Sequence, residues 1–286
     1  MRVTIGQINT TNGDCEGNVA RILGAIERAK RDQSDLVIFP EVTIQGYTSF
    51  DWFLDRDVQQ CALEPLQKII DATEGITAIV GTVRPSGLTT GRRLYNSAAV
   101  IRNKQLLGFA DKTLLPEYDV FDDPRYFQPS PQRHLFSLKN TDQERGVAVC
   151  EDFWNDKTFW KERLYAHDPA DELIALGADV LVSINASPFN KGKMGQRCEM
   201  VSHRARSAKI PIVFVNVSDP IGSGLVGSLA RPGGNLTGLM LYEEGITGKW
   251  LAMLKEITPR LTRAALIANP KTTPYDYFVR AAKTAA

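Results

Sequence analysis

The sequence has little net charge and no long hydrophobic run, and each of these absences excludes a class of protein. Of its 286 residues, 34 are Lys or Arg and 33 are Asp or Glu, so the formal net charge is only +1. A nearly neutral chain lacks the broad basic surface that nucleic acid requires, so we expect no nucleic-acid partner. No stretch approaches the ~18 apolar residues of a transmembrane helix. We therefore expect no membrane partner either.

Cysteine is also scarce. Cys15, Cys61, Cys150 and Cys198 lie far apart, and Cys15 and Cys61 do not have the spacing of metal ligands. We expect reduced thiols rather than a disulfide framework, and no metal site. The first residues, MRVTIGQINT, resemble a β-strand and lack the basic and apolar regions of a secretory leader. These features predict a cytoplasmic protein.

Helix and strand patterns alternate along most of the chain. Residues 18–30 carry apolar side chains at helical spacing, and residues 63–72 also suggest a helix. Short apolar runs such as DLVIFP, GVAVC and DVLVSI are typical of buried strands. A turn at residues 103–104 is expected to join two neighbouring strands. This alternation predicts an α/β layered fold.

Three of the predicted strands end at a chemically capable residue. Glu41 follows DLVIFP, Lys112 follows LLGFAD, and Cys150 follows GVAV. A cysteine thiolate can attack an amide carbon, and a carboxylate can remove the thiol proton and later protonate the leaving ammonia. A nearby lysine can stabilise the oxyanion of the tetrahedral intermediate. Together these side chains suffice for covalent amide hydrolysis without histidine.

Each of the three residues also has a purely structural interpretation. A cysteine at the end of an apolar strand is often only a small packed side chain. A glutamate after a strand is usually a solvated loop carboxylate. A lysine beside an aspartate, as Lys112 is beside Asp111, is usually a surface charge. Composition and spacing alone favour these interpretations.

The local sequence around the three residues resembles the nitrilase, or carbon–nitrogen hydrolase, superfamily. The segments concerned are IFPE with Gly-Tyr a few residues on, DKTLLPEYDVFDDPRYF, VCEDFW and NASPFNKGK. LPEYDVFDDPRYF is the most specific, and it resembles the glutaminase domain of glutamine-dependent NAD synthetases. The resemblance covers about residues 1–216. It implies a four-layer αββα sandwich and a homo-oligomer paired through the sandwich face.

The resemblance also implies roles for individual residues. Cys150 matches the nucleophile, Glu41 the general base and Lys112 the oxyanion-stabilising group. Glu151 matches a position that contacts the amino end of glutamine. The positions that match the substrate pocket are Tyr47, Tyr118, Phe121, Glu151, Ser187 and Arg197.

Two positions in LPEYDVFDDPRYF depart from the family pattern. Glu117 and Asp123 stand where Asn and Glu are expected. Asp123 keeps the charge but is shorter by one methylene. If this carboxylate positions the lysine, a displacement of about one ångström could cost on the order of 100-fold in rate.

The remainder of the chain resembles a different family. Residues 217–286 begin with the Gly- and Pro-rich segment VSDPIGSGLVGSLARPGGNLTG and continue as a predicted helix, GKWLAMLKEI, and a strand, AALIAN. This part is similar to a fragment of an ABC transporter substrate-binding protein. We therefore expect a chimera, in which a foreign α/β segment replaces the C-terminal strands of the sandwich. AALIAN or the amphipathic helix could cover the sheet edge that would otherwise be exposed.

The implied function is glutamine hydrolysis that releases ammonia through a cysteine thioester. No cofactor is expected for this step, since in the family ATP and deamido-NAD bind a separate synthetase domain that we do not find in the sequence. Ammonia would pass to a separate synthetase or to solvent. Three alternatives remain open: an amidase for another carboxamide, a binding module defined by the C-terminal segment, and an inactive fusion protein.

Overall fold

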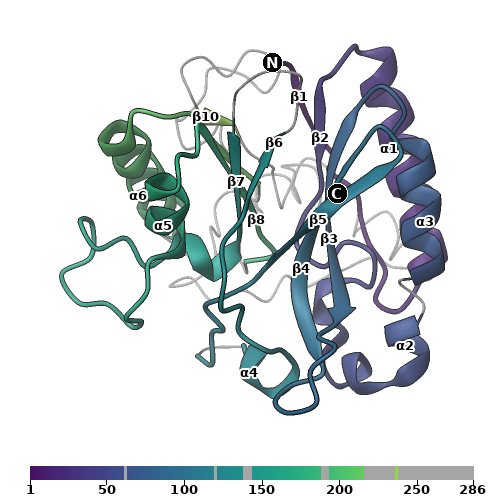
Figure 1. The fold of residues 1–286 in the computed structure, drawn as a ribbon, viewed down its shortest axis with the longest axis horizontal. Coiled ribbons are helices and arrows are strands. Elements are labelled where there is room, and N and C mark those ends of the chain that lie inside the picture. The colour runs from purple at the N-terminus through teal and green to yellow at the C-terminus, as the bar shows by residue number, and fades with distance from the viewer. Residues whose placement is uncertain (61–62, 119–120, 138–143, 188–192, 216–235, 238–286) are drawn as a thin grey trace, which may run out of the picture.

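Two β-sheets pack face to face, with helices on both outer faces, in a computed structural model of the chain (Figure 1). The structure describes residues 1–60, 63–118, 121–137, 144–187, 193–215 and 236–237. The four layers run helices, sheet, sheet, helices. This is the αββα sandwich predicted from the sequence.

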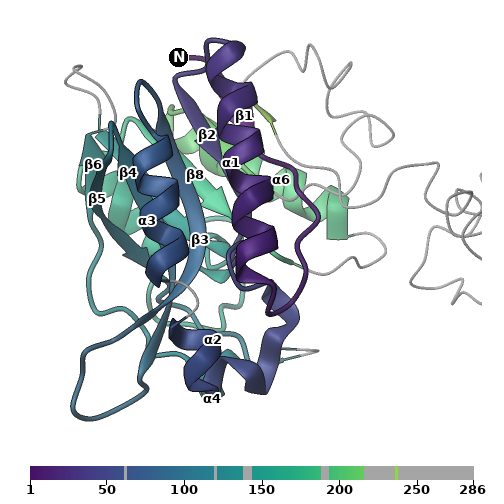
Figure 2. The ribbon, with the colours of Figure 1, turned by 90° about the vertical axis from the view of Figure 1, so that its right-hand side faces the viewer.

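The first sheet has the strand order β1-β2-β3-β4-β5. Its strands are β1 (Val3–Ile5), β2 (Leu36–Ile38), β3 (Thr77–Pro85), β4 (Leu94–Arg102) and β5 (Gln105–Asp111). β1, β2 and β3 are parallel, and β4 and β5 are added antiparallel. The two helices on its outer face are α1 (Cys15–Arg31) and α3 (Leu63–Ala72), seen side by side in Figure 2.

The second sheet has the order β10-β9-β8-β7-β6. Its strands are β6 (Leu135–Ser137), β7 (Glu144–Val149), β8 (Val180–Ile184), β9 (Ile212–Phe214) and β10 (Leu236–Thr237). The four strands from β7 to β10 are parallel, and β6 is antiparallel at the edge. Its outer helices are α5 (Pro169–Ala175) and α6 (Lys193–Ala208).

β2 shows why some strands have continuous apolar runs. Leu36 and Ile38 point into the core between the two sheets, whereas Val37 points toward α1 and α3. All three side chains are buried. A strand covered on both faces needs apolar residues at every position rather than at alternate ones.

Local sequence features explain several element boundaries. Asp14 caps α1 by accepting a hydrogen bond from the Gly17 N–H at 2.9 Å. Asn103 and Lys104 have φ values of 45° and 62°, and they form the predicted turn between β4 and β5. Gly177 has a φ of 105° and lies just beyond the end of α5.

Six shorter elements among the described residues were not predicted from the sequence. Four of them are helical turns without a long apolar stripe, and the other two are the edge strand β6 and the short strand β10. The four turns are η1 (Tyr47–Leu54), α2 (Arg56–Gln60), α4 (Asp123–Tyr126) and η2 (Cys150–Phe153).

The prediction that all cysteines are reduced is wrong for Cys15. Cys15 is disulfide-bonded, whereas Cys150 and Cys198 are free. Cys15 is the first residue of α1. The sequence predicted a helix in this region but no disulfide. Distance along the chain says little about which thiols the fold brings together.

β10 supplies the edge of the second sheet beside β9, with Leu236 opposite Ile212. This strand comes from the Gly- and Pro-rich segment, in which no strand was predicted. AALIAN and the predicted helix GKWLAMLKEI lie outside the described residues. The division at residue 216 and the replacement of the C-terminal strands therefore stay predictions. Within the described ranges, no helix combines the length and apolarity needed to cross a membrane.

Gly81 in β3 provides a test of how tightly the first sheet holds the segment after β2. A Cβ at this position would lie 2.2 Å from the Pro40 carbonyl oxygen and 2.4 Å from the Val42 nitrogen. Gly81→Ala should therefore push the backbone around Glu41 aside and lower the free energy of unfolding by about 1–3 kcal/mol. Urea denaturation measures this change.

Gly24→Ala is the matched control. Gly24 lies in the interior of α1, and an added Cβ would meet no atom within 4 Å. Alanine there should raise the free energy of unfolding by about 0.5–1 kcal/mol, because glycine is a poor helix former. Equal stabilities of the two variants would contradict the packing described around Gly81.

Candidate active site

The three strand-end residues lie where the two sheets meet. Glu41 follows β2 and Lys112 follows β5 in the first sheet, whereas Cys150 follows β7 in the second. Lys112 Nζ donates to Glu41 Oε1 at 2.8 Å. The charges of both residues act on the Cys150 thiol. The structure thus brings the predicted base, lysine and nucleophile into one cluster.

Glu41 is not a solvated loop carboxylate, because its side chain is fully buried. Oε1 accepts hydrogen bonds from Lys112 and, at 2.8 Å, from Asn96 Nδ2. Oε2 accepts from the Ala186 N–H at 2.9 Å. Three donors from separate segments therefore fix the orientation of this carboxylate.

Lys112 is likewise buried rather than a surface charge, with no exposed side-chain area. Its ammonium also donates to Asp123 Oδ2 at 2.7 Å. Burial opposes the charge, but Asp123 and Glu41 outweigh it and hold the pKa of Lys112 well above its ordinary value. A permanently charged lysine thus lies between two carboxylates.

Asp123 reaches this lysine despite being shorter than the glutamate expected there. Asp123 begins α4, whose first turn carries the carboxylate toward Lys112. Burial and the charge of Glu41 raise the pKa of Asp123, while Lys112 lowers it. The shorter side chain of Asp123 therefore still contacts Lys112. Glu117, the other departure, is exposed to solvent.

Cys150 differs from an ordinary strand residue in its backbone. β7 ends at Val149, and Cys150 starts the turn η2 with a φ of 49°. A non-glycine residue with positive φ is strained, and such strain often occurs at functional sites. Burial raises the pKa of the Cys150 thiol well above its ordinary value; Glu41 raises it further and Lys112 lowers it. The thiol therefore needs a base before it can act as a nucleophile.

Asp152 joins this turn to the segment that follows Lys112. Its Oδ1 accepts from the backbone N–H groups of Thr113 at 2.9 Å and Leu114 at 2.7 Å. Burial raises the pKa of Asp152 to about 7, although these two bonds lower it. Asp152 thereby ties the nucleophile turn in one sheet to the lysine in the other.

Glu151, next to the nucleophile, is held by tyrosine. The Tyr118 hydroxyl lies 2.8 and 3.0 Å from the two carboxylate oxygens. Tyr165 also hydrogen-bonds to Glu151. Burial raises the pKa of Glu151, whereas Tyr118, Lys112, Tyr165 and Lys193 lower it.

The predicted aromatic wall forms a continuous cluster. Phe121 makes edge contacts with Tyr47 at 6.4 Å and with Tyr118 at 5.6 Å between ring centroids. Burial and the charge of Glu41 raise the pKa of the Tyr47 hydroxyl. The three rings thus extend from the catalytic cluster to Glu151.

Ser187 and Arg197 are buried and hydrogen-bonded to each other. Arg197 Nη2 donates to Ser187 Oγ at 2.7 Å. The Arg197 guanidinium carbon lies 5.8 Å from the centre of the Trp154 ring, and Lys193 Nζ lies 5.0 Å from it. Burial lowers the pKa of Arg197. Two cations from α6 therefore face one aromatic ring near the nucleophile.

Three residues of the site were missed in the sequence. Asn96 lies inside β4, Asp152 follows two residues after the nucleophile, and Tyr165 belongs to a loop. None has a local pattern that marks it as functional. The acidic pair after Cys150 in VCEDFW was the only signal that could have pointed to Asp152.

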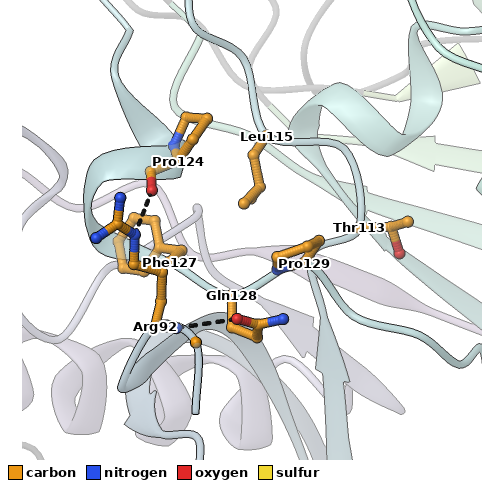
Figure 3. A pocket seen from close by; sticks show the side chains of 8 residues that line it. Arg92, Thr113, Leu115, Pro124, Phe127, Gln128 and Pro129 are labelled. Atoms are coloured by element: carbon orange, nitrogen blue, oxygen red, sulfur yellow. Dashed lines mark hydrogen bonds between the residues drawn. The ribbon is translucent and has the colours of Figure 1, made fainter.

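Two cavities lie near the segment that follows β5. One of about 170 Å³ is lined by Glu151, Tyr118 and Tyr165 among others. A larger one of about 540 Å³, shown in Figure 3, includes Arg92 and Gln128 in its wall but none of the nine predicted site residues. There the Arg92 side chain donates to the Pro124 carbonyl at 2.7 Å and its backbone N–H to Gln128. Of these two cavities, the smaller is therefore the one whose wall includes predicted site residues, Tyr118 and Glu151.

The described side chains of this site do not form a set of metal ligands. In the part of the chain that the structure describes, no group of three or more His, Cys, Asp or Glu side chains could hold a metal ion. The arrangement instead offers a thiol, a carboxylate base and a fixed cation. These are the components of covalent attack on a carbonyl carbon.

Replacing Lys112 tests the buried charge cluster. Lys112→Met leaves Glu41 and Asp123 without a counter-charge in the protein interior. We expect the free energy of unfolding at neutral pH to fall by about 3–5 kcal/mol. The loss should shrink as the pH falls, because protonation of Asp123, whose pKa burial raises, removes part of the uncompensated charge. Urea denaturation across a pH series measures both effects.

Lys104→Met is the control for loss of a lysine. Lys104 pairs with Glu74 at 2.7 Å, but both side chains are at least half exposed. Solvent screens such a pair, so no measurable change in stability is expected. Similar losses in both variants would show that Lys112 is not the buried counter-charge.

Comparison with known proteins identifies relatives for most of the chain. A glutamine-dependent NAD(+) synthetase from Synechocystis is 34% identical over 218 residues, which are 75% of this chain and 39% of that protein. One from Thermotoga maritima is 31% identical over 76% of this chain and 35% of its own length. The chain thus spans less than two fifths of these curated relatives.

Solved structures agree with the fold. The structure of the glutamine-dependent NAD+ synthetase from Acinetobacter baumannii has a TM-score of 0.66 and 30% identity, over 75% of this chain and 38% of that one. An amidase from Nesterenkonia has a TM-score of 0.60 at 18% identity, over 75% and 74% of the two chains. The latter supports the fold alone.

Two families match the sequence. The ABC transporter substrate binding protein family matches residues 165–286 and therefore includes the segment in which we noted that resemblance. The carbon–nitrogen hydrolase family matches residues 2–225, which include every residue of the candidate site. This chain belongs to the carbon–nitrogen hydrolase family.

Proposed function

We propose that this chain hydrolyses the side-chain amide of glutamine to glutamate and ammonia through a thioester on Cys150. The observation that carries the proposal is the buried ammonium of Lys112, held between Glu41 and Asp123 beside a strained cysteine. Burying a charge costs free energy, so a protein retains this arrangement only where each charge has partners. Here the partners are also the groups that amide hydrolysis requires.

The first step is activation of the thiol. Glu41 accepts the Sγ proton of Cys150, whose pKa burial has raised. The thiolate then attacks the carboxamide carbon of glutamine, and the carbonyl oxygen gains negative charge. Lys112, fixed by two carboxylates, supplies the positive charge that stabilises this oxyanion.

Collapse of the tetrahedral intermediate releases ammonia. Protonated Glu41 donates its proton to the leaving nitrogen, the carbon–nitrogen bond breaks, and an acyl thioester on Cys150 remains. Glu41 then removes a proton from water, and the resulting hydroxide attacks the thioester. Glutamate leaves, and Cys150 recovers its proton. No cofactor takes part in these steps.

Recognition of glutamine needs charge of both signs at its α-carbon. Glu151, held by Tyr118, supplies a carboxylate for the α-ammonium group. Arg197, with Ser187 as its hydrogen-bond partner, supplies a guanidinium for the α-carboxylate. Tyr47 and Phe121 form the apolar wall beside the side chain. The names of the relatives, glutamine-dependent NAD(+) synthetases, support glutamine as the substrate.

The wider context is part of the same proposal. Ammonia formed here would serve a separate synthetase that uses ATP and deamido-NAD, and the chain would pair with a second copy through the sandwich face. Residues 1–216 would form the hydrolase domain, and residues 217–286 would be a fragment of a substrate-binding protein joined to it.

Ammonia release from glutamine tests the proposed reaction. The purified chain should release ammonia, and Cys150→Ala should reduce the rate by at least about 1,000-fold, because it removes the nucleophile. Cys198→Ala, which removes the second free thiol among the described residues, should keep the wild-type rate. A coupled glutamate dehydrogenase assay measures the ammonia.

The other outcomes separate the alternatives. Release from other carboxamides but not from glutamine would identify an amidase of different specificity. A folded protein that hydrolyses no amide would be the inactive fusion. Release that survives in Cys150→Ala would contradict the thioester mechanism.

A further inference from the structure

The Glu151 carboxylate, proposed above to bind the α-ammonium group of the substrate, also accepts hydrogen bonds from tyrosine hydroxyl groups. It is buried and lies directly after the nucleophile. The hydroxyl of Tyr118 lies within 3.0 Å of both of its oxygens. Tyr165, from a different segment, lines the same cavity as Glu151 and forms a side-chain hydrogen bond with it. A buried carboxylate with two phenol donors is fixed in one orientation.

Tyr165 reaches this position because its loop is anchored at both ends. Residues 154–168 run between η2 and α5 and extend away from the second sheet (Figure 1). Asp156 and Asp168 both pair with the buried Arg204 of α6, at 3.3 and 3.0 Å. Within the loop, Asn155 Nδ2 donates to the Tyr165 carbonyl at 2.8 Å. The loop is thus tied to the sandwich on either side of Tyr165.

The cavity of about 170 Å³ lies between this loop and Glu151. Tyr118 and Tyr165 form part of its wall, together with Trp154 and Trp160, whose rings stack 6.4 Å apart. A water molecule occupies about 30 Å³ in the liquid, so the space can hold the α-carbon end of an amino acid. Glu151 is the buried anion in this wall.

We propose that Tyr165 is a positioning residue for substrate selection. With Tyr118 it fixes the Glu151 carboxylate so that the carboxylate faces the cavity, where it takes a free α-ammonium group. The site therefore favours amides of α-amino acids over amides that lack the amino group. This inference rests on the proposed glutamine hydrolysis and extends it to a residue outside the predicted site.

Tyr165→Phe tests this role by comparing two substrates. Glutaramate is glutamine without the α-amino group. In the variant, KM for glutamine should rise about tenfold, because a hydrogen bond to a charged group is lost. The value of kcat for glutamine and KM for glutaramate should stay unchanged. Steady-state ammonia release gives these constants.

Tyr126→Phe is the matched control. Its hydroxyl also bonds to a carboxylate, that of Asp51 at 3.1 Å, but it does not line the cavity. This variant should leave both KM values unchanged. If Tyr165→Phe instead raised KM for both substrates equally, or lowered kcat alone, Tyr165 would only stabilise the loop and the proposal would be wrong.

Binding measurements keep this test separate from catalysis. Calorimetry on Cys150→Ala should show tighter binding of glutamine than of glutaramate, and adding Tyr165→Phe should reduce that preference about tenfold. The wild-type chain could release no ammonia while Cys150→Ala still binds glutamine more tightly than glutaramate. That result would overturn only the proposed hydrolysis. Equal binding of the two ligands to Cys150→Ala would overturn the role of Tyr165.

Discussion

The burial of one ammonium group constrains much of this structure. Lys112 has no exposed side-chain area, and an isolated charge in that environment would cost several kcal/mol. Glu41 and Asp123 compensate that charge by accepting hydrogen bonds from the ammonium. Asn96 and the Ala186 N–H also donate hydrogen bonds to Glu41. The cluster is therefore stable only when β2, β4, β5 and α4 are all in place.

The candidate site also couples the two sheets to each other. The base and the lysine belong to the first sheet, whereas the nucleophile belongs to the second, so their separation depends on how the sheets pack. Ile38, the last residue of β2, and Val149, the last residue of β7, belong to the same core cluster between the sheets. Asp152 adds a direct tie by accepting hydrogen bonds from the segment after Lys112. The packing of the core between the sheets therefore also determines how the reacting groups are aligned.

The sequence predicted the parts of this arrangement that depend on local pattern. Strand ends marked Glu41, Lys112 and Cys150 as candidates, since apolar runs and the polar residues after them are visible in a single sequence. Their catalytic roles came from the resemblance to the carbon–nitrogen hydrolases. Asn96 could not be found, because nothing in a buried strand marks the one side chain that faces a carboxylate on the neighbouring segment. The disulfide of Cys15 was missed for a similar reason, as it depends on which loops the fold brings together. Long-range contacts of this kind leave no local trace.

The reacting groups and the loop that carries Tyr165 have different structural origins. Glu41, Lys112 and Cys150 follow strands of two packed sheets, so changes there disturb the core. Tyr165 lies on a loop whose ends are held by Arg204 and whose middle is exposed. Such a loop can change its side chains at little cost to the sandwich, provided that Asp156 and Asp168 remain. A family can therefore keep one hydrolytic centre while loops of this type alter the amides that reach it.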